Sequence, residues 1–313
     1  MMEDISQNLS YGITCIDSGY IRPNLAAIYL IEHKDEVAII DSGTNHSLSR
    51  VLTLLENKNI APEKVRYIVP THIHLDHAGG VGHMMKAFPN AKMIVHPRGA
   101  RHMEDPSFLI KAVIDVYGQE KYNALYGELT PVPSEKIIKA EDDMAFELSD
   151  RKFYIRYTPG HAEHHICIWD ELSKGWFTGD TFGISYPEMA GLTTRHIFPT
   201  TTPTHFNPEK LQNSIELLMS YKPARMYLTH FGLLENPQDY CDVLSKSISE
   251  YCEIAQTSSN TSNLEEEINK KISKLEHASL LKARPDLTEK ESQDLLEFDM
   301  KLNAQGLYYW VNQ

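Results

Sequence analysis

Residues 71–80, Thr-His-Ile-His-Leu-Asp-His-Ala-Gly-Gly, contain the highest density of reactive side chains in the chain. Four side chains that can bind a metal lie between positions 72 and 77: His72, His74, Asp76 and His77. Imidazole nitrogens and carboxylate oxygens are ligands for zinc, and imidazole also suits iron. A stretch that only needed surface polarity would have little reason to concentrate imidazole in this way. We therefore predict a metal site here.

The segment before this stretch must position it. Residues 65–69, Val-Arg-Tyr-Ile-Val, form an apolar run typical of a buried strand, and Pro70 and the glycine pair at 79–80 indicate a loop between them. If the chain is still extended at His72 and His74, strand alternation places both imidazoles on one side. The turn after His74 can bring Asp76 and His77 to a second point in space.

Three further motifs place ligand-type side chains next to predicted strands: Thr-Pro-Gly-His at 158–161, Phe-Thr-Gly-Asp at 177–180 and Leu-Thr-His at 228–230. Together with the first stretch, and in this order, they resemble the metallo-β-lactamase superfamily over residues 11–235. The resemblance implies an αββα sandwich with a dinuclear metal site at one edge. It also implies the ligands: His72, His74 and His161 for the first metal, Asp76, His77 and His230 for the second, and Asp180 as a bridge.

The implied cofactors are two divalent metal ions, with zinc expected and iron as the other option. Such ions acidify a bound water towards neutrality, so a bridging hydroxide can attack without a side-chain base. They also polarise the substrate oxygen and stabilise the oxyanion that forms. We assign catalytic roles to Asp76 and Asp180 through the metals they hold. Because neither Cys nor Ser occupies a ligand position, we expect no covalent intermediate.

The predicted reaction is hydrolysis of a small ester, lactone or thioester. A carboxylate that spans both metals, as Asp180 would, resembles glyoxalase II, lactonases and phosphodiesterases rather than true β-lactamases. One alternative is a diiron oxygen-binding or oxygen-reducing protein on the same fold. His74 stands where flavodiiron proteins usually have Glu, which favours hydrolysis. Another alternative is a metal-containing ligand-binding or regulatory protein with little turnover.

Residues 183–206 form a long segment rich in Thr, Pro and Gly, of the kind that often shapes an active site. We predict substrate contacts from three of its side chains: Tyr186, Arg195 and His205. The position of Tyr186 resembles that of a hydrogen-bonding loop tyrosine in some lactonases. His164 and His165 are candidates for contacts that orient the metal ligands.

The apolar patterns predict a layered α/β fold. Short runs at 28–31 and 37–40 suggest a hairpin, and the second run ends in Asp-Ser-Gly, a strand-to-turn signal. Helical spacing predicts a helix at 47–59 and a helical insertion at 97–127. Asn207-Pro-Glu is a good helix start. We assign residues 1–237 to the metallo-β-lactamase-like domain and 238–313 to a helical C-terminal extension.

The net charge of −13 argues against a nucleic acid or an anionic membrane as the main partner. The four cysteines form no CxxC pair, which fits reduced thiols. We see no signal peptide and no apolar run of membrane-spanning length. We therefore expect a cytoplasmic protein whose partner is a small-molecule substrate. The C-terminal helices are a candidate contact for a homodimer.

Overall fold

The structure is a computed structural model that describes residues 5–192, 194–201, 203–258 and 263–313. The acidic start of the chain and positions 193 and 202 of the predicted loop lie outside these ranges. The chain divides into two compact units. The first consists of Met1–Tyr157, His164–Gly179 and Ala224–Leu233, and the second of Thr158–Glu163, Asp180–Pro223 and Leu234–Gln313. The domain boundary predicted at residue 237 stays a prediction.

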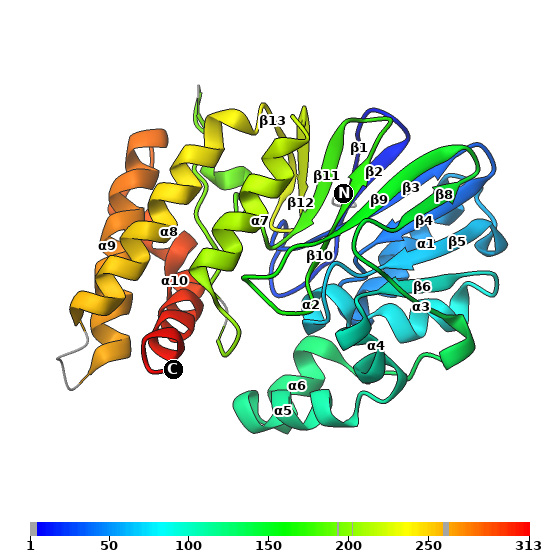
Figure 1. Cartoon of the computed structure of the whole chain (residues 1–313), viewed down its shortest axis with the longest axis horizontal. Coiled ribbons are helices and arrows are strands. Elements are labelled where there is room, and N and C mark those ends of the chain that lie inside the picture. The colour runs from blue at the N-terminus through cyan, green and yellow to red at the C-terminus, as the bar shows by residue number, and fades with distance from the viewer. Residues whose placement is uncertain (1–4, 193, 202, 259–262) are drawn as a thin grey trace. The chain divides into compact units, whose positions relative to one another are not determined.

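Over the described ranges the strands form two sheets (Figure 1). The first sheet runs in chain order through β1 (Ser6–Asn8), β2 (Ile13–Asp17), β3 (Ala27–His33), β4 (Glu36–Ile40), β5 (Val65–Val69), β6 (Lys92–Val95) and β7 (Ile137–Lys139). Strands β3 and β4 pair antiparallel, which confirms the predicted hairpin. From β4 to β7 the pairing is parallel, so the carboxyl ends of β4 and β5 lie at one edge of the sheet.

The second sheet has the order β13 (Gly232–Glu235), β12 (Arg225–Leu228), β11 (Gly175–Gly179), β10 (Ile166–Asp170), β9 (Arg151–Tyr157) and β8 (Ala145–Leu148). Aromatic side chains fill the space between the sheets. The Tyr29 ring lies 5.2 Å from that of Phe177 and 5.7 Å from that of Tyr227, measured between centroids. Tyr67 and Phe146 make a similar edge contact at 5.3 Å. Such pairs add to the free energy gained from burying the rings.

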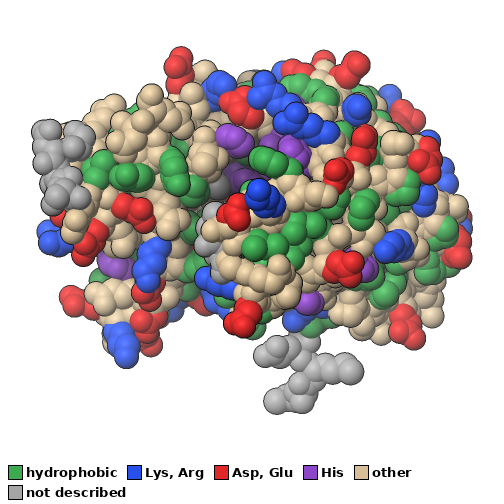
Figure 2. Space-filling model, turned by 90° about the horizontal axis from the view of Figure 1, so that it is seen from below, with side chains coloured by type: hydrophobic (Ala, Val, Ile, Leu, Met, Phe, Trp, Pro, Cys, Tyr) green, Lys and Arg blue, Asp and Glu red, His purple; other side chains and the backbone are tan. Residues whose placement is uncertain are grey.

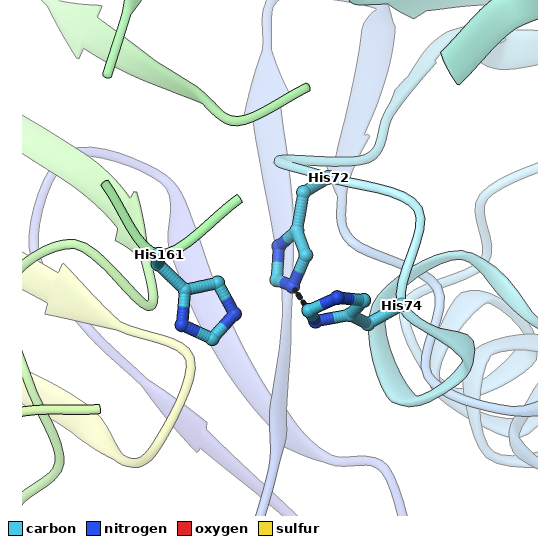
Figure 3. A group of neighbouring side chains, drawn as sticks. All are labelled: His72, His74 and His161. Carbon is cyan, nitrogen blue, oxygen red and sulfur yellow. Dashed lines mark hydrogen bonds between the residues drawn. The ribbon is translucent and has the colours of Figure 1, made fainter. Parts of the chain in front are cut away.

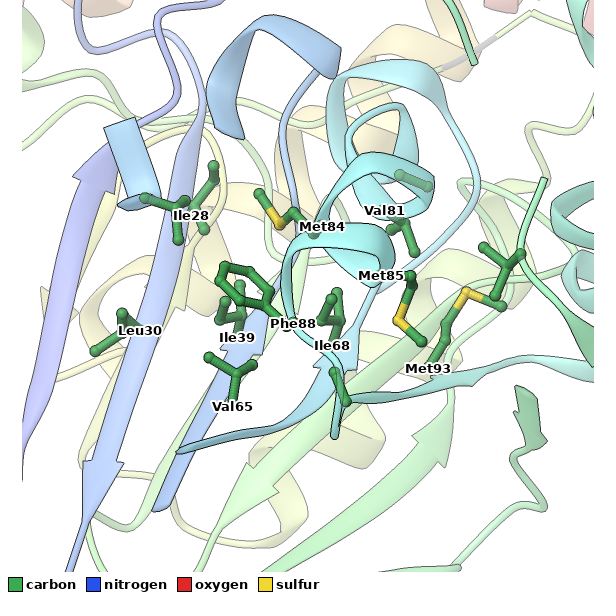
Figure 4. Packing of buried hydrophobic residues seen from close by; sticks show 14 of the residues in the cluster. Ile28, Leu30, Ile39, Val65, Ile68, Val81, Met84, Met85, Phe88 and Met93 are labelled. Carbon is green, nitrogen blue, oxygen red and sulfur yellow. The ribbon is translucent and has the colours of Figure 1, made fainter. Parts of the chain in front are cut away.

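The helices of the first unit alternate with its strands or follow them, and several pack on one face of the first sheet. They are α1 (Leu48–Asn57), α2 (Leu75–Ala78), α3 (Val81–Ala87), α4 (Pro97–Glu104), α5 (Ser107–Tyr117) and α6 (Gln119–Tyr126), the last three within the predicted helical insertion. Figure 4 shows Met84 and Phe88, at the end of α3, packed against Ile39 and Ile68 of the sheet. This packing fixes the chain on both sides of the short helix α2, which belongs to the histidine-rich stretch.

The second unit is mostly helical, with α7 (Pro208–Ser220), α8 (Gln238–Ser258), α9 (Leu264–Ala283) and α10 (Glu289–Val311). Helix α7 begins as the sequence predicts, because the Asn207 side chain accepts a hydrogen bond from the Lys210 amide at 2.9 Å. Helices α9 and α10 pack together, and α8 lies beside both (Figure 1). No helix within the described ranges is long and apolar enough to cross a membrane. Figure 2 shows acidic and basic side chains interspersed over one face.

A buried ion pair ties β9 to β10 in the first unit, and it gives a test of the sandwich. The Arg151 guanidinium donates to both Asp170 oxygens at 2.9 and 2.5 Å and to the Tyr11 carbonyl at 2.6 Å. Neither charged side chain is exposed. Arg151→Met should lower the free energy of unfolding by about 3–5 kcal/mol, because it leaves the Asp170 charge buried without its partner. Urea denaturation measures this. The double variant Arg151→Met/Asp170→Leu should recover part of the loss, and an equal or larger loss would contradict this explanation.

Candidate metal centre

A buried carboxylate, Asp41, organises the ligand-type side chains of the first unit. It follows β4 directly, and its backbone has a φ of +57°, in the left-handed region. Oδ1 accepts hydrogen bonds from the Thr71 amide at 2.7 Å and the Thr71 hydroxyl at 2.9 Å. Oδ2 lies 2.8 Å from the Thr229 hydroxyl and 2.9 Å from His77 Nδ1. Asp41 thus connects the residues that precede His72 and His230 with a third histidine.

The hydrogen bonds of two histidines fix the position of their ring protons. His77 Nδ1 faces the Asp41 carboxylate, and His230 Nδ1 lies 2.7 Å from the backbone carbonyl of Leu25. Because a carboxylate and a carbonyl only accept, each Nδ1 must carry a proton. In the neutral imidazole the lone pair is then on Nε2, the form in which histidine binds a metal. Both Nε2 atoms point to the same carboxylate, that of Asp76.

Asp76, on the first turn of α2, completes this group. Its Oδ2 lies 3.6 Å from His77 Nε2 and 3.5 Å from His230 Nε2. One ligand atom from each of the three residues lies within 4.8 Å of the others. Asp76 is half-buried, whereas the two imidazoles are buried. Three residues predicted to share a metal are therefore neighbours within the first unit.

His72 and His74 form the other group of this unit. His72 Nε2 lies 2.8 Å from His74 Nδ1, as the dashed line in Figure 3 shows. On the other side of the ring, His72 Nδ1 lies 3.2 Å from the Thr71 hydroxyl. Since that hydroxyl gives its proton to Asp41, it accepts from His72 Nδ1. His74 has extended backbone and directly precedes α2.

Two further predicted ligands, His161 and Asp180, are neighbours within the second unit. His161 Nε2 lies 3.2 Å from Asp180 Oδ2, and both side chains are buried. The Thr200 hydroxyl donates to the backbone carbonyl of Asp180 at 3.1 Å and lies 2.8 Å from His161 Nδ1. A hydroxyl has one proton, so Thr200 must accept from His161 Nδ1. The lone pair of His161 is again on Nε2 and faces a carboxylate.

The segment that carries His161 is held by helix α7 and by Asn207, the residue that caps its start. The Ser214 hydroxyl donates to the Pro159 carbonyl at 2.7 Å, and the Asn207 amide donates to the Gly160 carbonyl at 2.8 Å. Gly160 has a φ of +132°, and a Cβ there would lie 2.3 Å from the backbone nitrogen of Leu211. Only glycine fits this close approach. Pro159 and Gly160 thus bring the backbone before His161 into contact with α7.

The arrangement within each unit suits a cation. A neutral imidazole nitrogen and a carboxylate oxygen both offer lone pairs, so at these distances they repel unless a proton or a metal ion lies between them. This pattern occurs at His77 and His230 in the first unit and at His161 in the second. A donor set of imidazole and carboxylate fits divalent zinc and also iron. Each histidine also keeps its other nitrogen on a protein acceptor, as metal-binding histidines do.

Sequence reasoning missed Asp41, for which it predicted only a turn. The available signal was that Asp41 directly follows the buried strand β4. Because β4 runs parallel to β5, the ends of the two strands lie at one edge of the sheet, beside the histidine-rich stretch. His164 and His165 lie near His72, one of the predicted ligands. His164 Nδ1 accepts from the Ile73 amide at 3.5 Å, and the His165 ring stacks on that of His72 at 4.9 Å between centroids.

The three predicted substrate residues lie in different surroundings. Tyr186 is fully buried, and its hydroxyl donates to the Asp299 carboxylate on α10 at 3.0 Å. Arg195 is half-buried and donates to the Ser185 carbonyl, while His205 is exposed. Contact of these side chains with a substrate stays a prediction.

The role of Asp41 can be tested by changing its charge while keeping its shape. Asp41→Asn places an amide where a carboxylate oxygen accepts hydrogen bonds, so one donor of Thr71, Thr229 or His77 loses its acceptor. Loss of a partner that orients a ligand typically costs about 10–100-fold in metal affinity. We expect this loss in a titration of the metal-free protein with Zn²⁺ against a chelator. Thr14→Val, which removes a hydrogen bond to Asn8 on the same sheet, is the control. Wild-type affinity in Asp41→Asn would refute the role.

Several known proteins are similar to this chain. A metallo-β-lactamase fold-containing protein from Sulfurisphaera tokodaii is 28% identical over 231 residues, 71% of this chain and 79% of that protein. An acyl-coenzyme A thioesterase from Gallus gallus is 25% identical, covering 64% of this chain and 80% of the thioesterase. An N-acyl homoserine lactonase from Bacillus cereus is 26% identical, covering 64% and 68%.

Solved structures share the fold. An archaeal metallo-β-lactamase superfamily protein from Sulfolobus tokodaii has a TM-score of 0.65 at 22% identity, over 96% of this chain and 99% of that one. A chemotaxis sensor solved as a peroxy diiron species has a TM-score of 0.53 at 16% identity, over 77% and 93%. The predicted αββα-type fold with C-terminal helices is therefore confirmed. The model of the metallo-beta-lactamase superfamily matches residues 21–230, and the chain belongs to that superfamily.

Proposed function

We propose that this protein is a metal-dependent hydrolase with two divalent ions, most simply zinc. The observation that carries the proposal is the direction of the imidazole lone pairs: in each unit, Nε2 of a neutral histidine faces a carboxylate. The proposed ligands are those implied by the sequence motifs: His72, His74 and His161 for one ion, Asp76, His77 and His230 for the other, and Asp180 for both.

When bound, two such ions would acidify water towards neutral pH and polarise the bond to be hydrolysed. The side chains of this chain prepare the site for them. Asp41, the Leu25 carbonyl and the Thr200 hydroxyl hold the Nδ1 protons of His77, His230 and His161. These hydrogen bonds keep each ring in one orientation with its lone pair on Nε2. Ligands fixed in this way need no reorganisation when the substrate binds.

The proposed substrate is a small ester, lactone or thioester. Relatives named as an acyl-coenzyme A thioesterase and an N-acyl homoserine lactonase support this class. Both names describe an acyl carbon attacked by water with loss of a thiolate or an alkoxide. A nucleic acid is a poor candidate for a chain with a net charge of −13.

Hydrolysis can be tested on a panel that contains an acyl-coenzyme A, an N-acyl homoserine lactone and a phosphodiester. We expect turnover of at least one acyl substrate, and its loss on treatment with a chelator. Asp180→Asn should lower kcat/KM by more than about 100-fold, because loss of a ligand exceeds the effect of losing a partner that orients one. Asp150→Asn, an exposed aspartate bound to Lys34, is the control and should retain wild-type activity. Full activity in Asp180→Asn would refute the bridging role.

Iron is the second candidate, because imidazole and carboxylate donors also suit a diiron centre. Elemental analysis and the visible spectrum of protein purified without added metal distinguish the two. Zinc content with acyl hydrolysis supports the proposal. Iron content with oxygen consumption and no cleavage of any acyl substrate would overturn it in favour of an oxygen-reactive protein.

A further inference from the structure

Helix α10 binds the segment 199–201 of the second unit through one side chain, Asn303. Its Oδ1 accepts from the Thr201 amide at 2.7 Å, and its Nδ2 donates to the Pro199 carbonyl at 3.0 Å. The Thr201 hydroxyl donates to the Asn303 backbone carbonyl at 2.7 Å. All of these groups are buried, and Asn303 is 3% exposed. A single amide thus satisfies the backbone on both sides of Thr200.

Thr200, which lies between these two anchored residues, contacts the ligand pair of the second unit. Its hydroxyl accepts from His161 Nδ1 and donates to the Asp180 carbonyl. The hydroxyl can do both only if the backbone at 199–201 stays in place, because Thr200 has one χ1 angle with which to aim it. Asn303 holds this backbone on both sides of Thr200, so it is connected to His161 Nδ1 through the Thr200 hydroxyl.

Other buried contacts lie near this anchor. The Tyr251 hydroxyl donates to Met300 Sδ on α10 at 3.7 Å, and burial raises the pKa of Tyr251 well above its usual value. Glu276 Oε2 also lies 3.0 Å from His196 Nε2, so α9 holds the same loop at a second point. Tyr186 and Asp299 form a third link between loop and helix. These contacts add to the two hydrogen bonds by which the Asn303 side chain holds the segment 199–201 against α10.

We propose that Asn303 is a positioning residue for the metal site, and that α10 acts on metal binding through the path Asn303, Thr200, His161. The inference rests on the proposed role of His161 as a ligand. Asn303 touches neither metal nor substrate in this scheme; it sets the tautomer and the orientation of a ligand. The C-terminal extension would then be part of the metal site rather than an appended dimerisation element.

The test compares side chains of similar shape. Thr200→Val removes the hydroxyl, Thr200→Ser keeps it, and Asn303→Leu removes the amide anchor. Ser292→Ala is the matched control: Ser292 is a fully buried hydroxyl on α10 that binds His277 at 3.1 Å and is not connected to Thr200 by any of these hydrogen bonds. Each full-length variant is stripped of metal and titrated with Zn²⁺ against a chelator, with Co²⁺ absorption as a second probe. The melting temperature of the metal-free protein is measured in parallel.

We expect Thr200→Val and Asn303→Leu to bind one of two metal equivalents about 10–100-fold more weakly, as for other losses of a ligand-orienting partner. Thr200→Ser and Ser292→Ala should bind within about threefold of wild type, even if Ser292→Ala melts at a lower temperature. Wild-type affinity in Thr200→Val, or a Thr200→Ser variant as weak as Thr200→Val, would overturn the path. A lower melting temperature with unchanged affinity in Asn303→Leu would reduce Asn303 to a structural role.

These outcomes are separate from those of the proposed function. A wild-type protein that binds no divalent ion overturns the ligand set and this inference together. A wild-type protein that binds two ions while the variants match it overturns only the inference. Weakened metal binding in the variants of a protein that hydrolyses no acyl substrate would support the path and refute the hydrolase.

Discussion

A neutral imidazole has one N–H and one lone pair, and the candidate site depends on where the fold places that proton. His77, His161 and His230 each have Nδ1 against an oxygen that accepts, so each directs its lone pair through Nε2. The three acceptors are a carboxylate, a hydroxyl and a backbone carbonyl, from different parts of the chain. What they share is a buried, fixed position, and this makes one tautomer strongly preferred over the other.

Holding these acceptors in fixed, buried positions costs folding free energy. Asp41 is a buried charge in a left-handed backbone conformation, which costs about 1–3 kcal/mol for a non-glycine residue. Thr71, Thr229 and His77 give both oxygens of this buried carboxylate hydrogen-bond donors, which offsets part of the cost of burying it. The strands that end at these residues belong to a close-packed sandwich with aromatic contacts between its sheets. That packing supplies the rigidity with which a strained residue can be held.

The sequence predicted much of this because the signals are local. A strand, a loop boundary and four ligand-type residues occur in succession within residues 65–80, and the other predicted ligands lie in three short motifs. The orienting residues have no such signal. Asn303 and Thr201 are 102 positions apart, and a lone Asn on a charged helix looks like any solvated residue. Tyr186 is a similar case: its substrate contact stays a prediction, but no signal in the sequence indicated that its hydroxyl would donate to Asp299, 113 positions away. Tertiary packing determines the contacts of Asn303 and of Tyr186, and neither set of contacts can be deduced from sequence spacing alone.

The orienting hydrogen bonds also link metal affinity to the stability of the fold. A ligand that binds only the folded state stabilises it by about 2.7 kcal/mol when its concentration is 100 times its dissociation constant. If α10 holds Thr200 against His161, each factor of ten in metal affinity that this contact provides adds about 1.4 kcal/mol to the stability of the metal-bound protein. The contact would thus stabilise the folded protein in two ways, directly by anchoring the loop and indirectly by strengthening metal binding. Such coupling gives a physical reason why a helix that supplies none of the proposed ligands would still matter to the metal site.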